Sequence, residues 1–327
     1  MKKSKLFLTA TLCVLLNATG FGTQNAEAAD ASKFPTKTIE IIVPAGAGGG
    51  TDMVSRALAN KAKDILGKPI VIVNKPGGSG SIGFTAGQTA KPDGYTVTMF
   101  FIELVILPHL GTAPADYTKF EPIMMVNADP AAITVAADAP WKTIEEFIAY
   151  AKANPGKVRM ANSGSGSGWH LTAVSVEQKT GVQFAHIPFN GAAPGVTAIL
   201  GGNVEAIAVS PAEVGAQVNA GKLKMLAIAS DKRSKNFPNV PTLKERGIDV
   251  VMGAWRGLGV PLKTPPAVVK TLHDAFKKAM EDPVFVEQMD KADLGIRYMS
   301  GADTKKFFKA EYDNFGVLTE KVGLKKK

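Results

Sequence analysis

Short apolar runs rich in β-branched residues alternate along the chain with longer segments in which apolar residues recur every three or four positions. The first pattern is typical of buried strands, and the second is typical of helices that pack on a sheet. We expect strands at residues 38–43, 70–73, 96–101, 133–137, 158–161, 184–187, 206–209 and 225–229. Their alternation with helices predicts a doubly wound α/β architecture with parallel strands.

Several of the expected helices carry start signals. The segment after residue 50 places four apolar residues on one face, namely Val54, Leu58, Ala62 and Ile65. Thr143 and Glu146 have the spacing of a capping box before another helix. Two prolines at 265 and 266 open a helical segment over 268–280, and a further helix is expected over 303–322.

The N-terminus has the pattern of a secretory signal peptide. Three lysines at positions 2, 3 and 5 precede an apolar run over 6–16, and the small-residue segment 25–29 follows. We assign residues 1–28 to a cleaved signal peptide and expect a periplasmic mature protein. The apolar run is too short for a membrane span, which needs about 20 apolar residues, and no later stretch is longer.

Cysteine content and charge exclude several classes of site and partner. The only cysteine, Cys13, lies inside the apolar run, so the mature chain has no disulfide, thiolate nucleophile or sulfur-based zinc site. The small residue that precedes a lipidated cysteine is missing at Leu12, so no lipid anchor is expected. Removing residues 1–28 lowers the formal charge from +9 to +7 on 299 residues, and export argues against nucleic acid as the partner of this basic chain.

Two segments, 41–52 and 158–170, each place a strand, a glycine-rich turn and a helix start in the same order. We call residues 44–50 the first glycine turn and residues 162–168 the second glycine turn. A helix N-terminus has unpaired N–H groups and partial positive charge, so the two turns together suggest a clamp on an anion. The alternative for each turn is that glycine only provides tight backbone geometry.

Nucleotide and catalytic motifs do not fit these turns. The dinucleotide fingerprint needs a third glycine where Thr51 or Trp169 stands, and a phosphate-loop pattern over 78–83 has Phe84 in place of lysine. No G-x-S-x-G nucleophile motif occurs, and none of the four histidines has a metal-site spacing. We therefore expect no cofactor, no metal and no catalytic residue.

Motifs along nearly the whole mature chain resemble the Bug family, the periplasmic solute-binding receptors of tripartite tricarboxylate transporters. In the first half they are FPTKTI at 34–39, PAGAGGGTD at 44–52, NKPGG at 74–78, KPDGYT at 91–96 and PHL at 108–110. In the second half they are IPFNG at 187–191, LGGNVE at 200–205, FPNVPT at 237–242 and WRG at 255–257. The motifs occur in the family's order.

The resemblance implies a type II periplasmic binding protein fold, with two α/β lobes and a ligand cleft between them. We expect a discontinuous first lobe at 29–130 and 255–327 and a second lobe at 131–254. In open α/β sheets ligands bind outside the carboxyl ends of the strands, so each glycine turn would lie at the mouth of its own sheet.

The resemblance also implies that main-chain groups and ordered waters hold the ligand's carboxylate. Carried over by position, the contacts of the first lobe are Ala45, Gly46, Ala47, Gly48, Gly49 and Gly50, and those of the second lobe are Ser163, Gly164, Ser165, Gly166 and Ser167. Further cleft positions are Phe101, Glu103, Phe189, Asn190, Ser210 and Pro211. Asp52 matches a family acid, which we interpret as a helix N-terminal residue stabilised by the dipole and not as a ligand contact.

Five residues bear on the contacts and the identity of the ligand. Phe189 stands where the family commonly has a tyrosine, and Phe101, Trp169 and Phe189 suit an aromatic or apolar wall, although all three would also suit the core. Glu103 is either a solvent-facing residue at a strand end or a partner for a cationic or hydroxyl group of the ligand. His170 is either a ligand contact or a helix-capping residue.

The expected function is capture of a small organic carboxylate by lobe closure and its delivery to the membrane permease subunits of a tripartite tricarboxylate transporter. Candidate ligands are a di- or tricarboxylate, an amino acid or an aromatic acid, and we expect a monomer. One alternative is a periplasmic hydrolase or lyase that uses Glu103 and His170 as acid and base. Another is a receptor that reports the same ligand to a membrane sensor.

Overall fold

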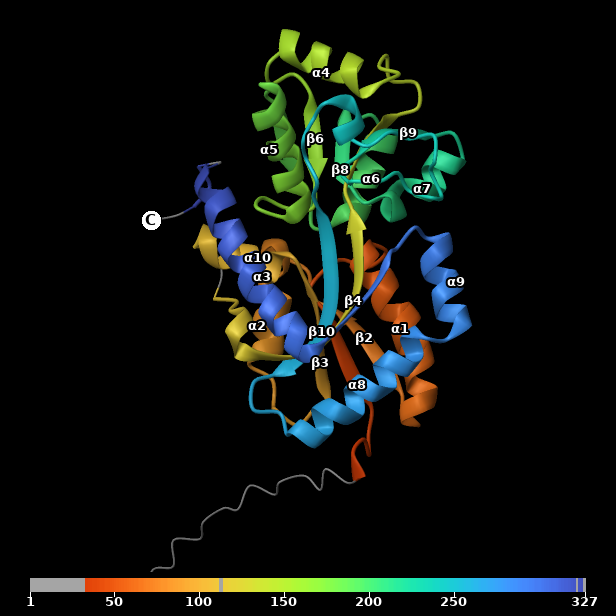
Figure 1. The fold of residues 1–327 in the computed structure, drawn as a ribbon, viewed down its shortest axis with the longest axis vertical. Coiled ribbons are helices and arrows are strands. Elements are labelled where there is room, and N and C mark those ends of the chain that lie inside the picture. The colour runs from red at the N-terminus through yellow and green to blue at the C-terminus, as the bar shows by residue number, and fades with distance from the viewer. Residues whose placement is uncertain (1–32, 112–113, 322, 326–327) are drawn as a thin grey trace, which may run out of the picture.

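The computed structural model describes residues 33–111, 114–321 and 323–325, which form two lobes stacked along the long axis of the molecule (Figure 1). The predicted signal peptide at 1–28 lies outside the described residues. Among the helices that the structure describes, none is long and apolar enough to cross a membrane.

The first lobe is built on a six-stranded sheet with the order β11-β4-β10-β3-β1-β2. Its strands are β1 (Ile39–Val43), β2 (Ile70–Asn74), β3 (Thr96–Phe101), β4 (Phe120–Pro130), β10 (Gly253–Pro261) and β11 (Ile296–Ser300). β1 runs parallel to β2 and β3, whereas β10 is antiparallel to β3 and β4, and β11 is antiparallel to β4.

Six α-helices belong to the first lobe. They are α1 (Gly50–Leu66), α2 (Ser81–Gln88), α3 (Glu103–Leu110), α8 (Pro266–Met280), α9 (Pro283–Lys291) and α10 (Gly301–Lys321). α1 packs beside α8 and α9, and α3 packs against α10. Short 3-10 helices occur at Gly78–Gly80 and Tyr117–Lys119, and a third lies at Lys244–Arg246.

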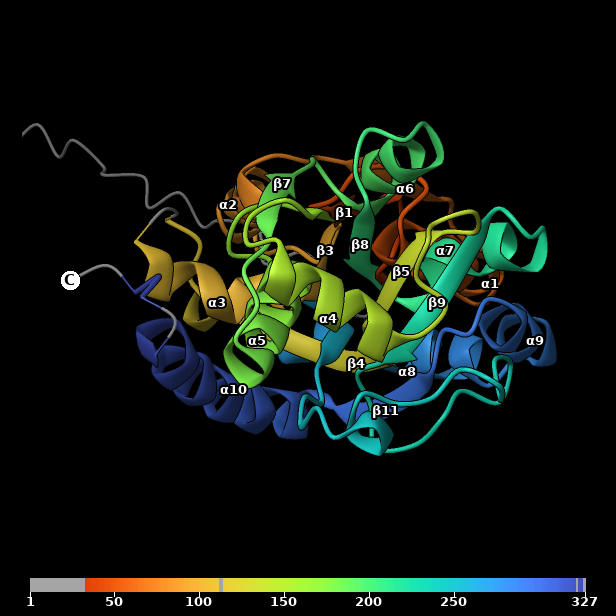
Figure 2. The ribbon, with the colours of Figure 1, turned by 90° about the horizontal axis from the view of Figure 1, so that it is seen from above.

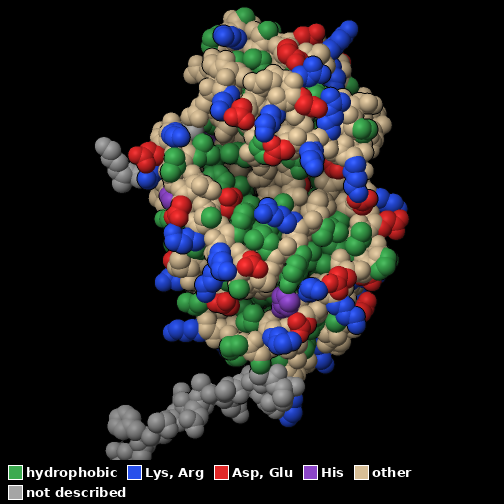
Figure 3. Space-filling model, in the orientation of Figure 1, with side chains coloured by type: hydrophobic (Ala, Val, Ile, Leu, Met, Phe, Trp, Pro, Cys, Tyr) green, Lys and Arg blue, Asp and Glu red, His purple; other side chains and the backbone are tan. Residues whose placement is uncertain are grey.

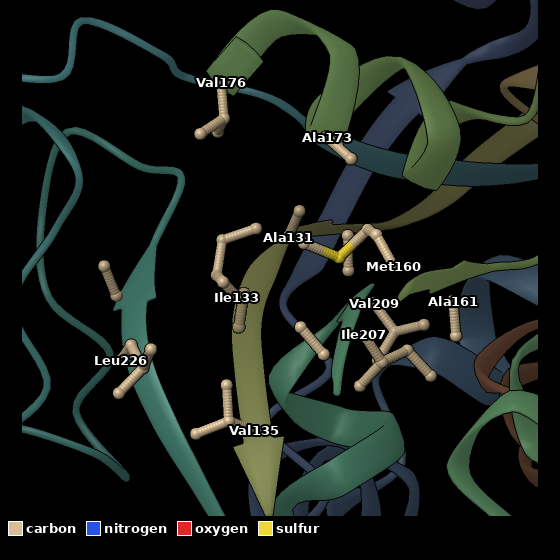
Figure 4. Packing of buried hydrophobic residues seen from close by; sticks show 14 of the residues in the cluster. Ala131, Ile133, Val135, Met160, Ala161, Ala173, Val176, Ile207, Val209 and Leu226 are labelled. Atoms are coloured by element: carbon tan, nitrogen blue, oxygen red, sulfur yellow. The ribbon is translucent and has the colours of Figure 1, made fainter. Parts of the chain in front are cut away.

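The second lobe is built on a five-stranded sheet with the order β7-β6-β8-β5-β9. Its strands are β5 (Ala132–Ala136), β6 (Arg159–Asn162), β7 (Ala185–Pro188), β8 (Ala206–Val209) and β9 (Leu223–Ile228), and its helices are α4 (Ile144–Ala153), α5 (Gly168–Thr180), α6 (Ala192–Leu200) and α7 (Pro211–Asn219). Figure 4 shows its core, where Ile133 and Val135 of β5 lie near Met160 of β6 and Ile207 of β8. The view from above shows the helices α4 and α5 over the first lobe (Figure 2).

The prediction of parallel strands is confirmed for β1 with β2 and β3 and for β6 with β7 and β8, but it is wrong for the rest of each sheet. In the second lobe β5 is antiparallel to β8 and β9, and in the first lobe β10 runs against both of its neighbours. The reason is that β4 leads the chain up into the second lobe and β10 brings it back, so these paired strands must run in opposite directions (Figure 1). The exact lobe boundaries at 130/131 and 254/255 stay a prediction.

The eight predicted strands are present, but only the Thr143 half of the predicted capping box is. The bounds at 96–101 and 206–209 are confirmed, and the other six strands shift by one or two residues at one or both ends. Thr143 Oγ1 accepts a hydrogen bond from the Glu146 N–H at 3.3 Å. The Glu146 carboxylate does not close the box on Thr143 but accepts from the Lys142 N–H at 2.6 Å. Three strands, β4, β10 and β11, were not predicted.

Candidate functional site

A cavity of about 60 Å³ lies between the two lobes, with both glycine turns contributing to its wall. Nine predicted site residues line it, namely Ala45, Gly46, Gly49, Gly50, Phe101, Glu103, Ser163, Trp169 and Asn190. The other ten predicted residues do not line it, namely Ala47, Gly48, Gly164, Ser165, Gly166, Ser167, His170, Phe189, Ser210 and Pro211. Ligand contact by any of them stays a prediction.

A second, more open pocket adjoins the cavity. Gly164, Ser165, Phe189 and Asn190 line it together with Ser79 of the opposite lobe. Ser79 Oγ donates to the carbonyl oxygen of Ser165 at 3.1 Å, so the lobes are in contact at this rim. Phe189 is therefore separated from the aromatic residues of the main cavity, Phe101 and Trp169.

Asp52, in the first turn of α1, fixes the first glycine turn by hydrogen bonds. Its carboxylate accepts from the Gly48 N–H at 3.0 Å, from Arg56 Nε at 2.9 Å and from Asn74 Nδ2 at 3.0 Å. Burial would raise the pKa of Asp52, but these hydrogen bonds hold it below its ordinary value. Asp52 thus fixes the turn, while the N–H groups of Gly46 and Gly49 have no acceptor among the described residues and lie at the cavity.

The second glycine turn, by contrast, uses most of its donors internally. The Gly164 N–H donates to Asn162 Oδ1 and the Gly166 N–H donates to His170 Nδ1, each at 3.0 Å. Ser167 caps α5, because its Oγ accepts from the His170 N–H at 3.1 Å. The contact of the His170 ring with the Gly166 N–H agrees with the helix-capping interpretation of His170. Burial, aided by the nearby His186, lowers the pKa of His170 to about 4.

Glu103 is buried, with 5% of its surface exposed, so its interpretation as a solvent-facing residue at a strand end is wrong. β3 ends at Phe101, and Glu103 begins α3 directly afterwards, which directs the carboxylate to the second lobe. Its Oε1 accepts from the Gly168 N–H at the start of α5, at 3.1 Å. Burial raises the pKa of Glu103 to about 7, although the Gly168 hydrogen bond and the Arg256 charge oppose the shift.

Glu213 of α7 makes the reciprocal contact from the second lobe. Its Oε1 accepts from the Gly50 N–H at the start of α1, at 3.0 Å, and its Oε2 accepts from the Ser210 N–H at 3.1 Å. Burial raises the pKa of Glu213 against the attraction of Arg256. Sequence reasoning missed this residue, although the Ser-x-x-Glu spacing of 210 and 213 is a capping-box signal.

Arg256 of β10 is also part of the cavity wall and was not predicted. Its side chain is 1% exposed and forms an ion pair with Asp129 of β4. It also donates to Thr51 Oγ1 at 3.0 Å and to Asn127 Oδ1 at 2.5 Å. A β-carbon at Gly50 would lie 2.8 Å from the Arg256 Nη2 atom, which explains why glycine stands at the start of α1.

The chemistry of this wall suits a small polar solute. Two glutamates, one arginine and the first glycine turn line the cavity, and Phe101 and Trp169 line it as well. Within the described ranges, no group of three or more His, Cys, Asp or Glu side chains could hold a metal ion. The outer face in Figure 3 carries intermixed acidic and basic side chains over both lobes.

Comparisons with known proteins identify the family. The profile of the tripartite tricarboxylate transporter family receptor, TctC, matches residues 54–324. A protein from Cupriavidus necator, described as the UPF0065 protein in the gbd 5' region, is 38% identical over 327 residues, covering 100% of this chain and 99% of that protein.

Three solved structures share the fold. A TctC solute-binding protein from Polaromonas without ligand is 45% identical, with a TM-score of 0.66 over 88% of this chain and 99% of that one. The periplasmic binding protein BugD is 31% identical, with a TM-score of 0.86 over 90% and 100%. MatC from Rhodopseudomonas palustris with bound malate is 25% identical, with a TM-score of 0.81 over 87% and 99%. This chain therefore belongs to the TctC family of tripartite tricarboxylate transporter receptors, the periplasmic solute-binding proteins that include Bug proteins.

Proposed function

We propose that this protein captures a small organic carboxylate between its lobes in the periplasm and delivers it to the membrane permease of a tripartite tricarboxylate transporter. The observation that carries the proposal is the first glycine turn, in which Gly46 and Gly49 line the cavity between the lobes and their N–H groups have no acceptor among the described residues. A carboxylate would satisfy these donors and gain from the positive end of α1. The malate bound to MatC supports this class of ligand.

Lobe closure supplies the binding mechanism. A ligand on the first glycine turn also contacts Ser163, Trp169 and Asn190 of the second lobe only when the lobes are together. Ligands shift a conformational equilibrium by their extra contacts in one state, so this difference favours the closed form. Hydrogen bonds to a charged group contribute roughly 1.5–3 kcal/mol each, so a few support micromolar affinity after binding costs.

The site favours binding over catalysis. For a hydrolase or lyase, Glu103 and His170 would serve as acid and base, but His170 Nδ1 accepts from the Gly166 N–H and the residue does not line the cavity. A receptor for a membrane sensor would use the same ligand chemistry. Transport is the role that the family description supports.

A thermal-shift screen of the mature protein against dicarboxylates, tricarboxylates, amino acids and aromatic acids tests the proposal. At about 100 times its dissociation constant, a ligand adds roughly 2.7 kcal/mol to the free energy of unfolding. We expect at least one acid to raise the melting temperature, to bind one per monomer and to be recovered unchanged. Turnover of the acid, or a response to sugars or cations alone, would contradict the proposal.

A further inference from the structure

We propose that Glu103 is a specificity residue, which selects a ligand with a carboxylate at one end and a hydrogen-bond donor, an ammonium or a hydroxyl group, at the other. The inference rests on the proposed function, because it assumes that the ligand's carboxylate lies on the first glycine turn. It goes further by assigning the chemistry of the opposite end.

The argument begins with the donors that the protein leaves free. In the second glycine turn, the N–H groups of Gly164, Gly166 and Gly168 already donate to Asn162, His170 and Glu103. In the first glycine turn, the N–H groups of Gly48 and Gly50 donate to Asp52 and Glu213, whereas those of Gly46 and Gly49 have no acceptor among the described residues. Each turn thus holds a glutamate of the opposite lobe at its helix end, but among the described residues the first turn leaves Gly46 and Gly49 at the cavity without an acceptor and the second leaves only Ser163, so the two turns do not form a symmetric clamp for two carboxylates.

The position that a second ligand carboxylate would need is taken by Glu103 itself. Its Oε1 accepts from the N-terminal N–H of α5, and the residue lines the cavity while being 95% removed from solvent. A ligand anion placed against it would have to share that helix end with a buried carboxylate. In its ionised form Glu103 repels a ligand anion at close range in this desolvated site, whereas a donor group gains a charge-assisted hydrogen bond and favours that ionised form.

The other charged groups around Glu103 do not compensate for a second anion. Arg256 from β10 attracts Glu103, but its guanidinium already pairs with Asp129 and donates to Asn127 and Thr51. Glu213 from α7 adds a further carboxylate to the wall. The cavity wall therefore accepts hydrogen bonds at this end, and Phe101 and Trp169 offer apolar surface for the carbons between the two ends.

Calorimetric titration with straight-chain acids of four to six carbons tests the inference. At each length the far end is a methyl, a hydroxyl, an ammonium or a carboxylate group, so the four acids differ only there. We expect an ammonium- or hydroxyl-ended acid to bind at least about tenfold tighter than the methyl- and carboxylate-ended acids of its length. The better of the two donor-ended acids identifies the donor.

Glu103→Gln tests the residue itself. The glutamine oxygen can still accept from the Gly168 N–H, but the charge is gone. We expect the ammonium-ended acid to lose about tenfold in affinity and the carboxylate-ended acid to gain affinity. The difference in affinity between the two acids should therefore become smaller. The matched control is Glu311→Gln, because Glu311 accepts from Trp255 Nε1 at 3.2 Å and is absent from the cavity wall. It should leave the ranking unchanged.

The outcomes separate the inference from the proposed function. If the carboxylate- or methyl-ended acids bind as well as the donor-ended acids, the inference is wrong while the receptor function stands. An unchanged ranking in Glu103→Gln overturns the role of Glu103 in the same way. If this variant does not fold, the wild-type ranking alone decides. If no acid of this series or of the broader screen binds, the proposed function fails and the inference fails with it.

Discussion

The buried charges of the cavity wall form a connected group at the level of single residues. Arg256 lies between strands β10 and β4 and joins Asp129 and Asn127 of β4 to Thr51 of α1. A buried ion pair contributes little net stability by itself, but removal of one partner leaves the other charge uncompensated. Arg256 therefore has a structural role in the lobe connection as well as a place in the cavity wall.

Arg256→Met is expected to lower the free energy of unfolding by about 3–5 kcal/mol, because it leaves the Asp129 charge buried without a partner. Addition of Asp129→Asn should restore part of the loss by removing that charge. Urea denaturation of the single and double variants measures both effects. Arg159→Met is the surface control, since its pair with Glu205 is solvent-exposed, and a loss no larger than this control would contradict the role of Arg256.

Glu103 and His170 are expected to give opposite pH dependences of stability. Glu103 has a pKa of about 7 in the folded protein against an ordinary 4.5, so the folded state binds more protons and the free energy of unfolding falls as pH rises between these values. His170 has a pKa of about 4 against an ordinary 6.5, so its contribution is lost as pH falls through that window. In the wild type the two effects largely cancel between pH 4.5 and 6.5.

Glu103→Gln removes the contribution of Glu103 that opposes His170, so between pH 4.5 and 6.5 its free energy of unfolding should rise relative to that of the wild type by up to about 3 kcal/mol. Denaturant unfolding at half-unit pH intervals measures the slope, with Glu40→Gln at the exposed position of β1 as the control. Parallel curves for wild type and Glu103→Gln would show that Glu103 does not titrate in this range.

At the level of elements, the sequence predicted the parts whose chemistry is local. β8 is a continuous apolar run, β3 is apolar apart from Thr96 and Thr98, and the first glycine turn leads directly from β1 into the apolar face of α1. β4 and β10 were missed because Asn127, Asp129 and Arg256 interrupt their apolar pattern, and these polar residues pair with one another only in the folded sheet.

Glu213 and Arg256 were missed for the same physical reason, because their partners lie far away in the sequence. Glu213 contacts a glycine that lies 163 positions earlier in the chain, and Arg256 reaches Thr51 across 205 positions. No periodicity or short motif reports such a pairing. The resemblance to the family located the turns but did not show that the second glycine turn would be filled by Glu103.

The start of α1 provides a matched pair of substitutions. A β-carbon at Gly50 would meet the Arg256 guanidinium, which Thr51, Asn127 and Asp129 hold in place, so the side chain cannot move aside. Gly50→Ala should lower the free energy of unfolding by about 1–3 kcal/mol and weaken carboxylate binding. At Gly49 the nearest atom to a β-carbon is 3.6 Å away, so Gly49→Ala should cost less than about 1 kcal/mol.

Chemical denaturation and calorimetric titration of these two glycine variants measure both quantities. Equal effects of the two substitutions would contradict the role of the Arg256 contact. A large effect of Gly49→Ala alone would instead place the critical packing at the N-cap residue of α1.

At the scale of the whole molecule, hydrogen bonds across the cleft hold the two lobes together in a closed arrangement. Glu103 and Glu213 each extend from one lobe to the helix N-terminus of the other, and Ser79 joins Ser165 at the rim. BugD superimposes on this chain better than the ligand-free Polaromonas protein does, although the latter is more similar in sequence. A different angle between the lobes of the two proteins would explain why the more similar sequence superimposes less well. We expect the lobes of this protein to move about a hinge as well.

Small-angle X-ray scattering tests the hinge. The radius of gyration of the wild-type protein should decrease when it is saturated with its tightest acid, because closure brings the lobes together. Glu213→Ala removes the acceptor of the Gly50 N–H, so its ligand-free radius of gyration should exceed that of the wild type and should fall further on saturation. Glu205→Ala is the control, because Glu205 pairs with Arg159 within the second lobe and should leave the ligand-free value unchanged. Identical values with and without ligand in all three proteins would show that binding occurs without lobe movement.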